Sequence, residues 1–424
     1  MHQANTFSWM SLFIPRHDDM PQRRYDLDWL RVIVFGLLIL FHTGMYYVAN
    51  WGWHAKSAYQ SQFLENIMLI VEPWRMPVLW LIAGIAIRFI LAKVSVWRFV
   101  ALRSLRLLLP LLFGVLVVVP PQLYVEMSYN GDLNMNYWQF LVEFFSSDST
   151  VFYNYTSGIW PHIDVNHLWF IRSLWTYSLG LLFLTPLLNA KVITRAVNGL
   201  LKCHGAFAIV VATLPIFIIQ ISYESGQARY PLGFTLMVYG YLIGWNSLFW
   251  QKLADNIKPL LITAVACFVG LICFYNLVWI EVIKGQEVSN QLMLLAGMFN
   301  YSLMRTLGVL TVFAFAYKCL NFNSLKLHYF NNAVYPFYIL HQSFILVIGF
   351  NLSKLNLGPT IEPILLLTFT IMSCFLAYEI IRRTAILRPL FGLKMSAGYS
   401  KRMQRIGYIT ASILIAPLGV EILI

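Results

Sequence analysis

The sequence predicts an all-α fold, a polytopic transmembrane helix bundle of about ten spans with its N-terminus in the cytoplasm. Of the 424 residues, 59% are hydrophobic and only 11% are charged. Soluble domains carry about 25% charged residues, so this chain has too little polar surface to cover a soluble core of its size. The predicted solvent of the fold is therefore the lipid bilayer.

The second observation is a series of apolar runs long enough to cross a membrane, which takes about 20 residues in a helix. The predicted spans are Leu30–Val48, Met68–Arg88, Leu105–Val119, Leu168–Leu188, Ala206–Ser222, Pro231–Trp250, Leu260–Ile280, Leu292–Tyr317, Val334–Phe350 and Glu362–Ile381. A further run, Ile406–Ile424, is a candidate for an eleventh span. No internal repeat, low-complexity tract or soluble domain interrupts the series.

The third observation is the placement of lysine and arginine, which gather in cytoplasmic loops of membrane proteins. Alternate segments are rich in these residues: Arg16, Arg23, Arg24, Arg31; Lys93, Arg98, Arg103, Arg106; Lys191, Arg195, Lys202; Arg382, Arg383, Arg388, Lys394, Lys401, Arg402, Arg405. The loops between them hold only Lys56, Arg229, Lys284 and Lys354, and residues 120–166 hold none. The net charge of +12 is thus mainly a topology signal, which argues against nucleic acid as a partner.

The predicted organisation has three parts: a cytoplasmic N-terminal segment 1–29, a membrane domain 30–394, and a basic tail with a candidate extra helix 395–424. No apolar signal-peptide core precedes the first long run, so that run is predicted to be an uncleaved span. Five scattered cysteines lack metal-ligand spacing and suggest small core residues, with neither a disulfide framework nor a metal site. The sequence leaves open whether the chain acts alone or as a homodimer.

Ionisable residues inside spans are costly and are functional candidates by default. Arg31 and His42 lie eleven residues apart in the first span, which returns them to nearly the same helix face with a rise of about 16 Å. Arg31 is then expected at the cytoplasmic end and His42 in the outer half of the membrane. For an isolated pair, a snorkelling arginine with a packing histidine is an equally good interpretation.

Other spans place ionisable groups at a similar depth. These groups are Glu72, Arg75, Arg305 and His341, with His167 and Arg172 near the outer end of the fourth span. Together they predict a polar cavity within the bundle, open to the outside. The structural alternative is a set of buried charge pairs that fix helix register, which suits Glu72 with Arg75 because the two are three residues apart on one helix.

A cytoplasmic pair, Arg103 and Arg106, is also three residues apart on one helix face. Two guanidinium groups in this arrangement suit a polyphosphate. On spacing alone, ordinary positive-inside charge or contact with anionic lipid head groups is the better explanation, because any inner helix end shows such pairs.

Several motifs resemble those of the family 3 membrane acyltransferases. Arg31-x10-His42 follows "LDWLR", "WRMPVLWLIAG" is similar to a family segment, and Arg103-x-x-Arg106 precedes "LLLP". "HLWFI" at 167–171, "FYILHQSF" at 337–344 and "YEIIRR" at 378–383 also match family patterns, so the resemblance covers about residues 24–394. Within the family, "HLWF", "YFNNA" and the basic "LFGLK" tail resemble the subgroup that succinylates osmoregulated periplasmic glucans. The chain departs from the family pattern at Gln342 and Ser343, where a second histidine or a proline is common.

The resemblance implies an enzyme, an O-acyltransferase of the inner membrane that moves an acetyl or succinyl group from cytoplasmic acyl-CoA to a hydroxyl of an extracytoplasmic glycan. Arg31, Arg103 and Arg106 would hold the CoA phosphates, and His42 would be the general base. Arg75 or His341 would stabilise the oxyanion, and Glu72 would orient His42 or Arg75. An acyl-His42 intermediate is the alternative to direct transfer.

The acceptor side is predicted from the outer aromatic stretch, where His167, Trp169 and Arg172 are the candidate substrate-binding residues. An interfacial aromatic belt explains that stretch equally well. A membrane transporter or flippase would also need a polar centre, and would be favoured by inverted repeats and broken half-helices. A third alternative, a passive scaffold for glycan synthesis, predicts that His42 can be replaced without loss of function.

Overall fold

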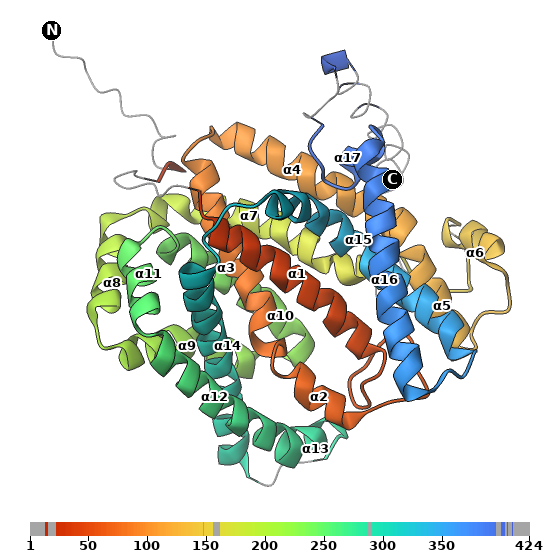
Figure 1. Ribbon diagram of the computed structural model, residues 1–424, viewed down its shortest axis with the longest axis horizontal. Helices are drawn as coiled ribbons and strands as arrows, with labels where there is room; N and C mark the ends of the chain where they lie inside the picture. Colours follow the sequence, from red (N-terminus) through yellow and green to blue (C-terminus); the bar gives the residue numbers. More distant parts are fainter. Residues whose placement is uncertain are drawn as a thin grey trace. The chain divides into compact units, whose positions relative to one another are not determined.

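The computed structural model describes residues 13–15, 23–146, 148–155, 162–286, 290–395, 400–402, 405 and 409. Within this part of the chain nine helices are long and apolar enough to cross a membrane, or ten if one bent pair counts as a single span. All of the regular secondary structure described is helical. The predicted fold class, a polytopic helix bundle of about ten spans, is confirmed (Figure 1).

The helices follow one another closely along the chain. In the first half they are α1 (Tyr25–Met45), α2 (Gln62–Met68), α3 (Glu72–Leu91), α4 (Val96–Phe113), η2 (Gly114–Val118), α5 (Pro120–Asn130), α6 (Tyr137–Phe144), η3 (Asn166–Leu168), α7 (Trp169–Leu188) and α8 (Lys191–Lys202). In the second half they are α9 (Gly205–Ser222), α10 (Ser225–Ile243), α11 (Ser247–Asp255), α12 (Ile257–Phe274), η4 (Tyr275–Trp279), α13 (Ile280–Ile283), α14 (Gln291–Cys319), α15 (Leu325–Ser353), α16 (Gly358–Arg383) and α17 (Leu387–Leu390).

Each of the ten predicted spans overlaps one of these helices or bent pairs, and two differ in a way that sequence patterns did not predict. The third does not end at Val119: a π-helical turn, closed by the Val119 amide on the Gly114 carbonyl at 2.9 Å, leads directly into α5. Pro120 and Pro121 are tolerated there because the first turn of a helix needs no amide hydrogen. The sixth is broken, since α10 and α11 meet at 101°. The candidate eleventh span, 406–424, lies outside the described residues apart from Ile409.

The outer surfaces of the spans carry large apolar side chains. Phe183 of α7 is 82% exposed, Ile262 of α12 is 69% exposed and Leu376 of α16 is 66% exposed. In water such a surface would drive aggregation, but in lipid it has no hydrophobic cost. These side chains are therefore consistent with a bundle that faces acyl chains.

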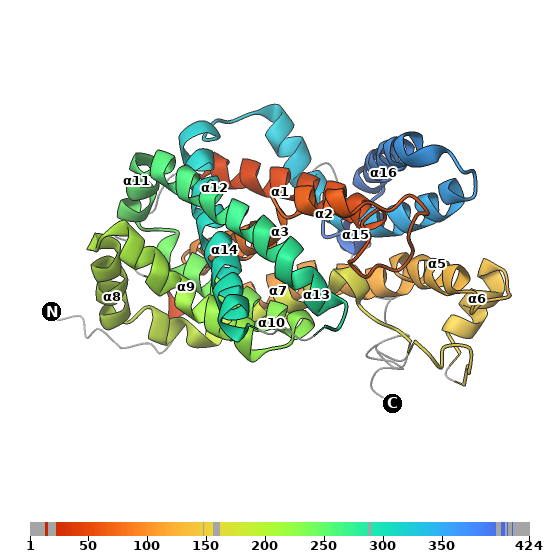
Figure 2. The same ribbon diagram turned by 90° about the horizontal axis from the view of Figure 1, so that it is seen from below.

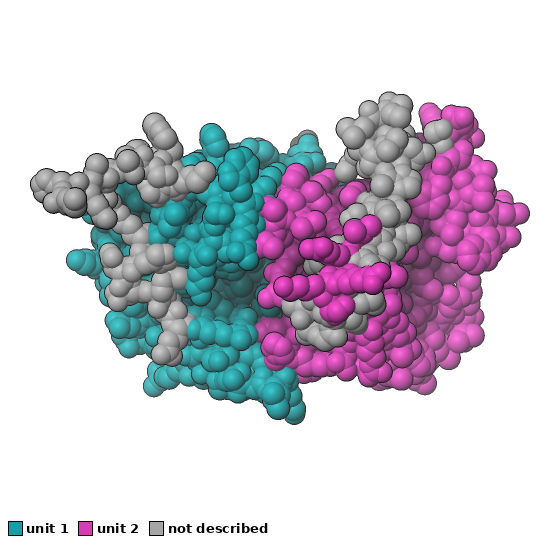
Figure 3. All heavy atoms as spheres, turned by 90° about the horizontal axis from the view of Figure 1, so that it is seen from above, with its two compact units in different colours: residues 1–37, 66–100, 176–327 teal, residues 38–65, 101–175, 328–424 magenta. Residues whose placement is uncertain are grey.

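The chain forms two compact units, coloured separately in Figure 3. Unit 1 comprises residues 1–37, 66–100 and 176–327, and unit 2 comprises residues 38–65, 101–175 and 328–424. Four long helices, α1, α4, α7 and α15, contribute to both.

Close contact between backbones holds unit 1 together. Helix α10 packs along α3, and α12 packs along α14 (Figures 1 and 2). Gly84 of α3 lies so near the Met237 carbonyl, and Gly240 of α10 so near the Leu81 carbonyl, that a Cβ at either position would overlap main-chain oxygen. Small residues at helix crossings are how membrane helices gain dispersion contacts, because lipid provides no hydrophobic drive for their association.

Unit 2 surrounds a polar centre with two apolar clusters. One cluster is built on Tyr46, Tyr47, Val125, Ile345 and Leu346, and joins the end of α1 to α5 and α15. A second, aromatic cluster gathers the side chains of Met127, Phe140, Phe144 and Phe152 beneath the segment 131–155. The groups between and beside these clusters form the candidate site.

Candidate active site

Two histidines from distant parts of the sequence meet in unit 2. The Nδ1 atom of His42, in the last turn of α1, lies 2.7 Å from the Nε2 atom of His341 in the middle of α15. The two rings are almost coplanar, with an angle of 6° between their planes. The similar depth predicted for His42 and His341 is thus realised as a direct hydrogen bond between them.

The surroundings of His341 determine where the protons lie. Its Nδ1 atom is 2.8 Å from the Tyr338 carbonyl oxygen and 3.1 Å from the Phe337 carbonyl oxygen. A carbonyl oxygen only accepts hydrogen bonds, so Nδ1 of His341 carries the hydrogen. In the neutral ring, Nε2 of His341 is then the acceptor and Nδ1 of His42 the donor.

This assignment gives His42 a defined chemical state. With its hydrogen on Nδ1, the neutral imidazole carries its lone pair on Nε2, where it can take a proton. The ring lies 5.3 Å from that of Trp53, between centroids. The hydrogen bond to His341 thus holds His42 in one tautomer, as the orienting residue of a catalytic triad holds its base.

His167 supports the pair from η3. Its ring contacts that of His341 edge to face, with centroids 5.5 Å apart. Its Nε2 atom donates to the Ile339 carbonyl at 2.9 Å, and its Nδ1 atom accepts from the Gln122 amide at 3.2 Å. The side chain is buried, and the Tyr338 hydroxyl donates to its main-chain carbonyl.

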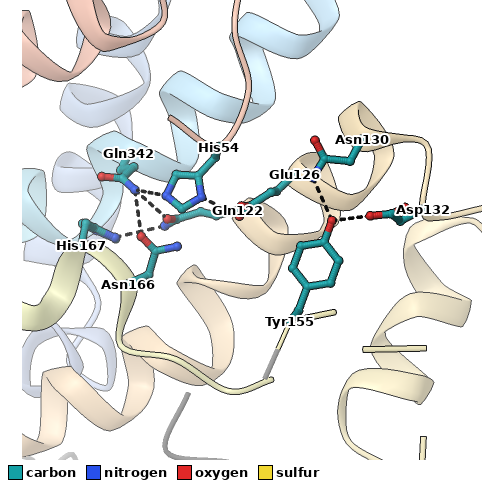
Figure 4. A network of polar contacts seen from close by, with 9 residues as sticks. All are labelled: His54, Gln122, Glu126, Asn130, Asp132, Tyr155, Asn166, His167 and Gln342. Atoms are coloured by element: carbon teal, nitrogen blue, oxygen red, sulfur yellow. Dashed lines mark hydrogen bonds and ion pairs between the residues drawn. The ribbon is translucent and has the colours of Figure 1, made fainter. Parts of the chain in front are cut away.

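Amide side chains extend this network, which Figure 4 shows. The Gln342 amide nitrogen, which carries two hydrogens, lies near three acceptors that can share them: Oε1 of Gln122 at 3.2 Å, Oδ1 of Asn166 at 3.0 Å and Nε2 of His54 at 3.2 Å. Gln122 donates in turn to the Ser343 hydroxyl at 2.7 Å. Buried amides of this kind are costly unless satisfied, so the network specifies one arrangement of α5, η3 and α15.

The network ends at a hydrogen-bonded pair of a histidine and a carboxylate. Nδ1 of His54 lies 2.6 Å from Oε2 of Glu126, which α5 carries one turn beyond Gln122. Because a carboxylate only accepts hydrogen bonds, Nδ1 of His54 carries a hydrogen that points at Glu126.

Sequence reasoning missed Gln122, Asn166, His54 and Glu126. Gln122 and Glu126 lie in the segment that was predicted to be a loop, and helical spacing shows that they share a face only once α5 is recognised. Asn166 has a φ of 45°, a left-handed conformation that asparagine tolerates better than most residues. Gln342 and Ser343, noted only as departures from the family pattern, are members of the network.

Unit 1 holds a separate polar cluster of charged residues. The Tyr301 hydroxyl donates to the Glu72 carboxylate at 2.7 Å and accepts from Arg305 at 3.0 Å. Arg305 also donates to the Gln220 side chain at 2.5 Å. Glu72, Arg305 and the buried Arg75 therefore lie in unit 1, whereas His42, His341 and His167 lie in unit 2.

The remaining candidates are spread along the spans. Arg103 and Arg106 belong to the part of α4 in unit 2, where Arg106 is exposed and its main-chain carbonyl accepts from the Tyr335 hydroxyl at 3.3 Å. Arg31 lies in the part of α1 in unit 1. Trp169 and Arg172 are half-buried in α7, and the Trp169 ring contacts Phe170 edge to face. Glu379 accepts from Arg382 at 2.7 Å and Arg383 at 2.8 Å at the end of α16.

Comparison with known proteins places this chain. Residues 24–379 match the family 3 acyltransferases, described as an acyltransferase domain. The chain is 22% identical over 393 residues to the Glucans biosynthesis protein C of Escherichia coli strain K12, covering 88% of this chain and 95% of the relative. The protein of the same name in Salmonella gallinarum is 22% identical over 395 residues with the same coverage. No solved structure matches the chain significantly. The match over most of its length shows that this membrane protein belongs to the family 3 acyltransferases.

Proposed function

We propose that the protein is an O-acyltransferase that moves an acetyl or succinyl group from cytoplasmic acyl-CoA to a hydroxyl of a glucan outside the inner membrane. The family supports acyl transfer, and the names of the relatives connect them with glucan biosynthesis. The observation that carries the mechanism is the hydrogen bond between His42 and His341, which leaves Nε2 of His42 as the basic nitrogen.

In the proposed reaction, Nε2 of His42 removes the proton from the acceptor hydroxyl while its oxygen attacks the thioester carbonyl. The tetrahedral intermediate then collapses, the C–S bond breaks, and the CoA sulfur takes the proton from His42. While His42 is protonated, its bond to Nε2 of His341 becomes charge-assisted and stronger. General-base catalysis of this kind contributes typically 10²–10⁴-fold to a rate.

Both ring nitrogens of His341 have partners inside the protein, so we assign it a positioning role in place of the oxyanion contact. The same argument makes His167 a positioning residue and not a substrate ligand. Arg75 stays the proposed oxyanion donor, and Glu72 acts through Tyr301. Trp169 and Arg172 stay proposed acceptor contacts, and Arg31, Arg103 and Arg106 stay the proposed ligands of the CoA phosphates.

The decisive experiment measures thiol release from a panel of acyl-CoA thioesters, including acetyl-CoA and succinyl-CoA, by the full chain in nanodiscs with a gluco-oligosaccharide acceptor. His42→Ala is expected to remove at least 10²-fold of the activity. His328→Ala is the matched control, because His328 is an exposed histidine on the same helix as His341. Full activity of His42→Ala would exclude His42 as the general base. Equal thiol release with and without the protein would favour the passive scaffold.

A second measurement tests the donor site. Arg103→Ala and Arg106→Ala are expected to raise the KM for acyl-CoA about tenfold or more, because each removes a charged contact with phosphate. Arg98→Ala is the control, since Arg98 is an exposed arginine of the same helix. Folded wild-type protein that neither binds nor turns over any CoA thioester would overturn the acyl-CoA mechanism in favour of a transporter or flippase.

A further inference from the structure

The His54–Glu126 pair differs in exposure from the network beneath it. The side chains of His54 and Glu126 are 21% and 27% exposed, whereas Gln122 and Gln342 are 0% and 2% exposed. The buried amides therefore form the rigid part of the network. The His54–Glu126 pair is the part that a molecule outside the protein can reach. Figure 4 shows this order along the chain of contacts, from His167 through the amides to Glu126.

Within the pair, the two members have different capacities. Both ring nitrogens of His54 are occupied, Nε2 by the Gln342 amide and Nδ1 by the carboxylate. A carboxylate has about four acceptor positions, and the bond to His54 uses one of them. Glu126 is thus the group with hydrogen-bonding capacity for a ligand, while His54 and Gln342 fix the orientation of its carboxylate.

The pair lies close to the proposed catalytic base. Trp53 is in ring contact with both histidines, with its centroid 5.3 Å from that of His42 and 5.3 Å from that of His54. The same indole therefore contacts both the proposed base and the histidine bonded to Glu126, and it offers an aromatic ring on which a face of a sugar can pack.

Charge around the pair favours a neutral ligand. Beyond Glu126 on α5, the Tyr155 hydroxyl donates to Asp132 at 2.7 Å and accepts from Asn130 at 2.9 Å. Burial, together with the bond to Asp132, raises the pKa of Tyr155 to about 12, so it stays a donor at neutral pH. Residues 120–166 contain five acidic residues and no lysine or arginine. An excess of carboxylates in this segment favours hydroxyl donors over anions as ligands.

We infer that Glu126, oriented by His54 and Gln342, is the acceptor subsite of this enzyme and binds the vicinal hydroxyls of a neutral sugar ring beside His42. The inference rests on the proposed acyl transfer and names its acceptor class, an uncharged polyol in preference to an anionic one. Gln342 is a specificity-determining positioning residue in this scheme, because its amide contacts Nε2 of His54, the histidine that donates to the carboxylate. A different side chain at position 342 would change the orientation of the Glu126 carboxylate.

The test separates sugar binding from acyl transfer. Calorimetric titration of laminaritetraose into the full chain in nanodiscs, without acyl-CoA, measures the subsite alone. Glu126→Gln is expected to weaken binding about 10- to 100-fold, as the loss of a hydrogen bond to a charged group does. In the thiol-release assay the same variant is expected to raise the acceptor KM similarly, with kcat at saturating acceptor and the KM for acyl-CoA within threefold of wild type.

The matched control is Glu143→Gln, which removes the same charge from the neighbouring helix α6 outside the network of Figure 4 and should leave both quantities unchanged. His54→Gln and Gln342→Asn serve as second variants if Glu126→Gln does not fold, and both should raise the acceptor KM more than they lower kcat. A uronic-acid analogue of the oligosaccharide should bind wild type more weakly than laminaritetraose does, and Glu126→Gln should narrow that difference.

Two outcomes would overturn the subsite: wild-type affinity for laminaritetraose in both Glu126→Gln and His54→Gln, or no binding by wild-type protein at millimolar sugar. Failure of the proposed function has a different signature, because wild-type protein would then release no thiol from any acyl-CoA whether or not it bound the sugar. The two results can be read independently in one preparation.

Discussion

Units 1 and 2 both bury polar side chains in membrane-spanning helices, and the two sets differ in kind. In unit 1 the cluster is charged, with Arg305 and Glu72 joined through the Tyr301 hydroxyl. In unit 2 the centre is built from histidines and amides, with the partly exposed pair of His54 and Glu126 at its end.

The difference teaches what each arrangement can do. A carboxylate and a guanidinium that share a bridging hydroxyl compensate one another's charge and fix helix register, which is a structural task. A chain of neutral imidazoles and amides instead fixes the position of each proton, which is what a general base needs. We therefore expect changes to the histidines and amides of unit 2 to act on turnover. Changes to the Tyr301 bridge and to the helix packing of unit 1 should act mainly on stability, whereas Arg31 and Arg75 of unit 1 keep their proposed roles toward the CoA phosphates and the oxyanion.

The largest expected effect is that of His341→Phe. The change removes the acceptor that holds the hydrogen of His42 on Nδ1, so the base loses its tautomer and orientation. We expect kcat to fall by about 10²–10⁴-fold, with the KM for acyl-CoA unchanged. Steady-state thiol release with saturating acceptor measures the fall.

His341→Gln is the conservative partner of that variant, because its amide oxygen can accept from Nδ1 of His42. Partial recovery of kcat in His341→Gln, with the same unfolding midpoint as His341→Phe, would identify a positioning role. Equal activity in wild type and His341→Phe would remove the distinction between the two units, because the defined proton positions would then have no catalytic consequence.

The sequence predicted much of this arrangement, for reasons that can be stated residue by residue. Helical rise along each of their two spans placed His42 and His341 at similar depth. That similar depth predicted that they belong to one polar site. It could not predict that they share a hydrogen bond, because the relative rotation of α1 and α15 depends on packing. The sequence could not predict α5 either, because two consecutive prolines usually indicate the start of a loop. In the structure a π-helical turn that begins at Gly114 precedes the prolines, and α5 continues directly from it.

The same limit explains why the sequence grouped residues that belong to different units. Glu72, Arg75 and Arg305 were grouped with the histidines because depth was the sole coordinate that the sequence supplied. The structure assigns them to unit 1, where Tyr301, a residue without any signal in the sequence pattern, joins Glu72 to Arg305. Uncharged polar side chains such as Tyr301 and Gln122 complete these sites, whereas only the charged residues and histidines could be recognised from the sequence.

Tyr301→Phe is expected to have the largest effect in unit 1. It removes a hydroxyl that contacts both a carboxylate and a guanidinium, and leaves both without this bridge inside the unit. We expect a loss of about 3 kcal/mol in the free energy of unfolding, measured by denaturant titration in mixed micelles. A normal stability with a hundredfold lower kcat would instead show that the charged cluster takes part in the chemistry, as the sequence suggested for Glu72 and Arg75.

Gly84→Ala tests the packing of unit 1 with a somewhat smaller expected effect. The added Cβ would overlap the Met237 carbonyl on α10, so α3 and α10 must separate, at a cost of about 2 kcal/mol. Gly199→Ala is the matched control, because no atom lies within 4 Å of its Cβ position in α8, and alanine there should stabilise the helix by about 0.5–1 kcal/mol. Opposite signs for the two variants in one unfolding assay would support close backbone packing, and equal effects would contradict it.

The smallest expected change in stability is that of Asn166→Gly, and it separates strain from function most directly. Glycine adopts the φ of 45° at Asn166 without a steric penalty, but it lacks the side-chain oxygen that accepts from Gln342 at 3.0 Å. The two effects oppose each other, so the free energy of unfolding should change by less than about 1 kcal/mol. The Gln342 amide would then have two of its three acceptors, and its hold on His54 would loosen. We expect a severalfold rise in the acceptor KM from the thiol-release assay, with kcat nearly unchanged.

A gain in stability without any change in the acceptor KM would show that Asn166 is needed only for the backbone turn. It would also show that the amides of unit 2 do not transmit orientation as far as Glu126.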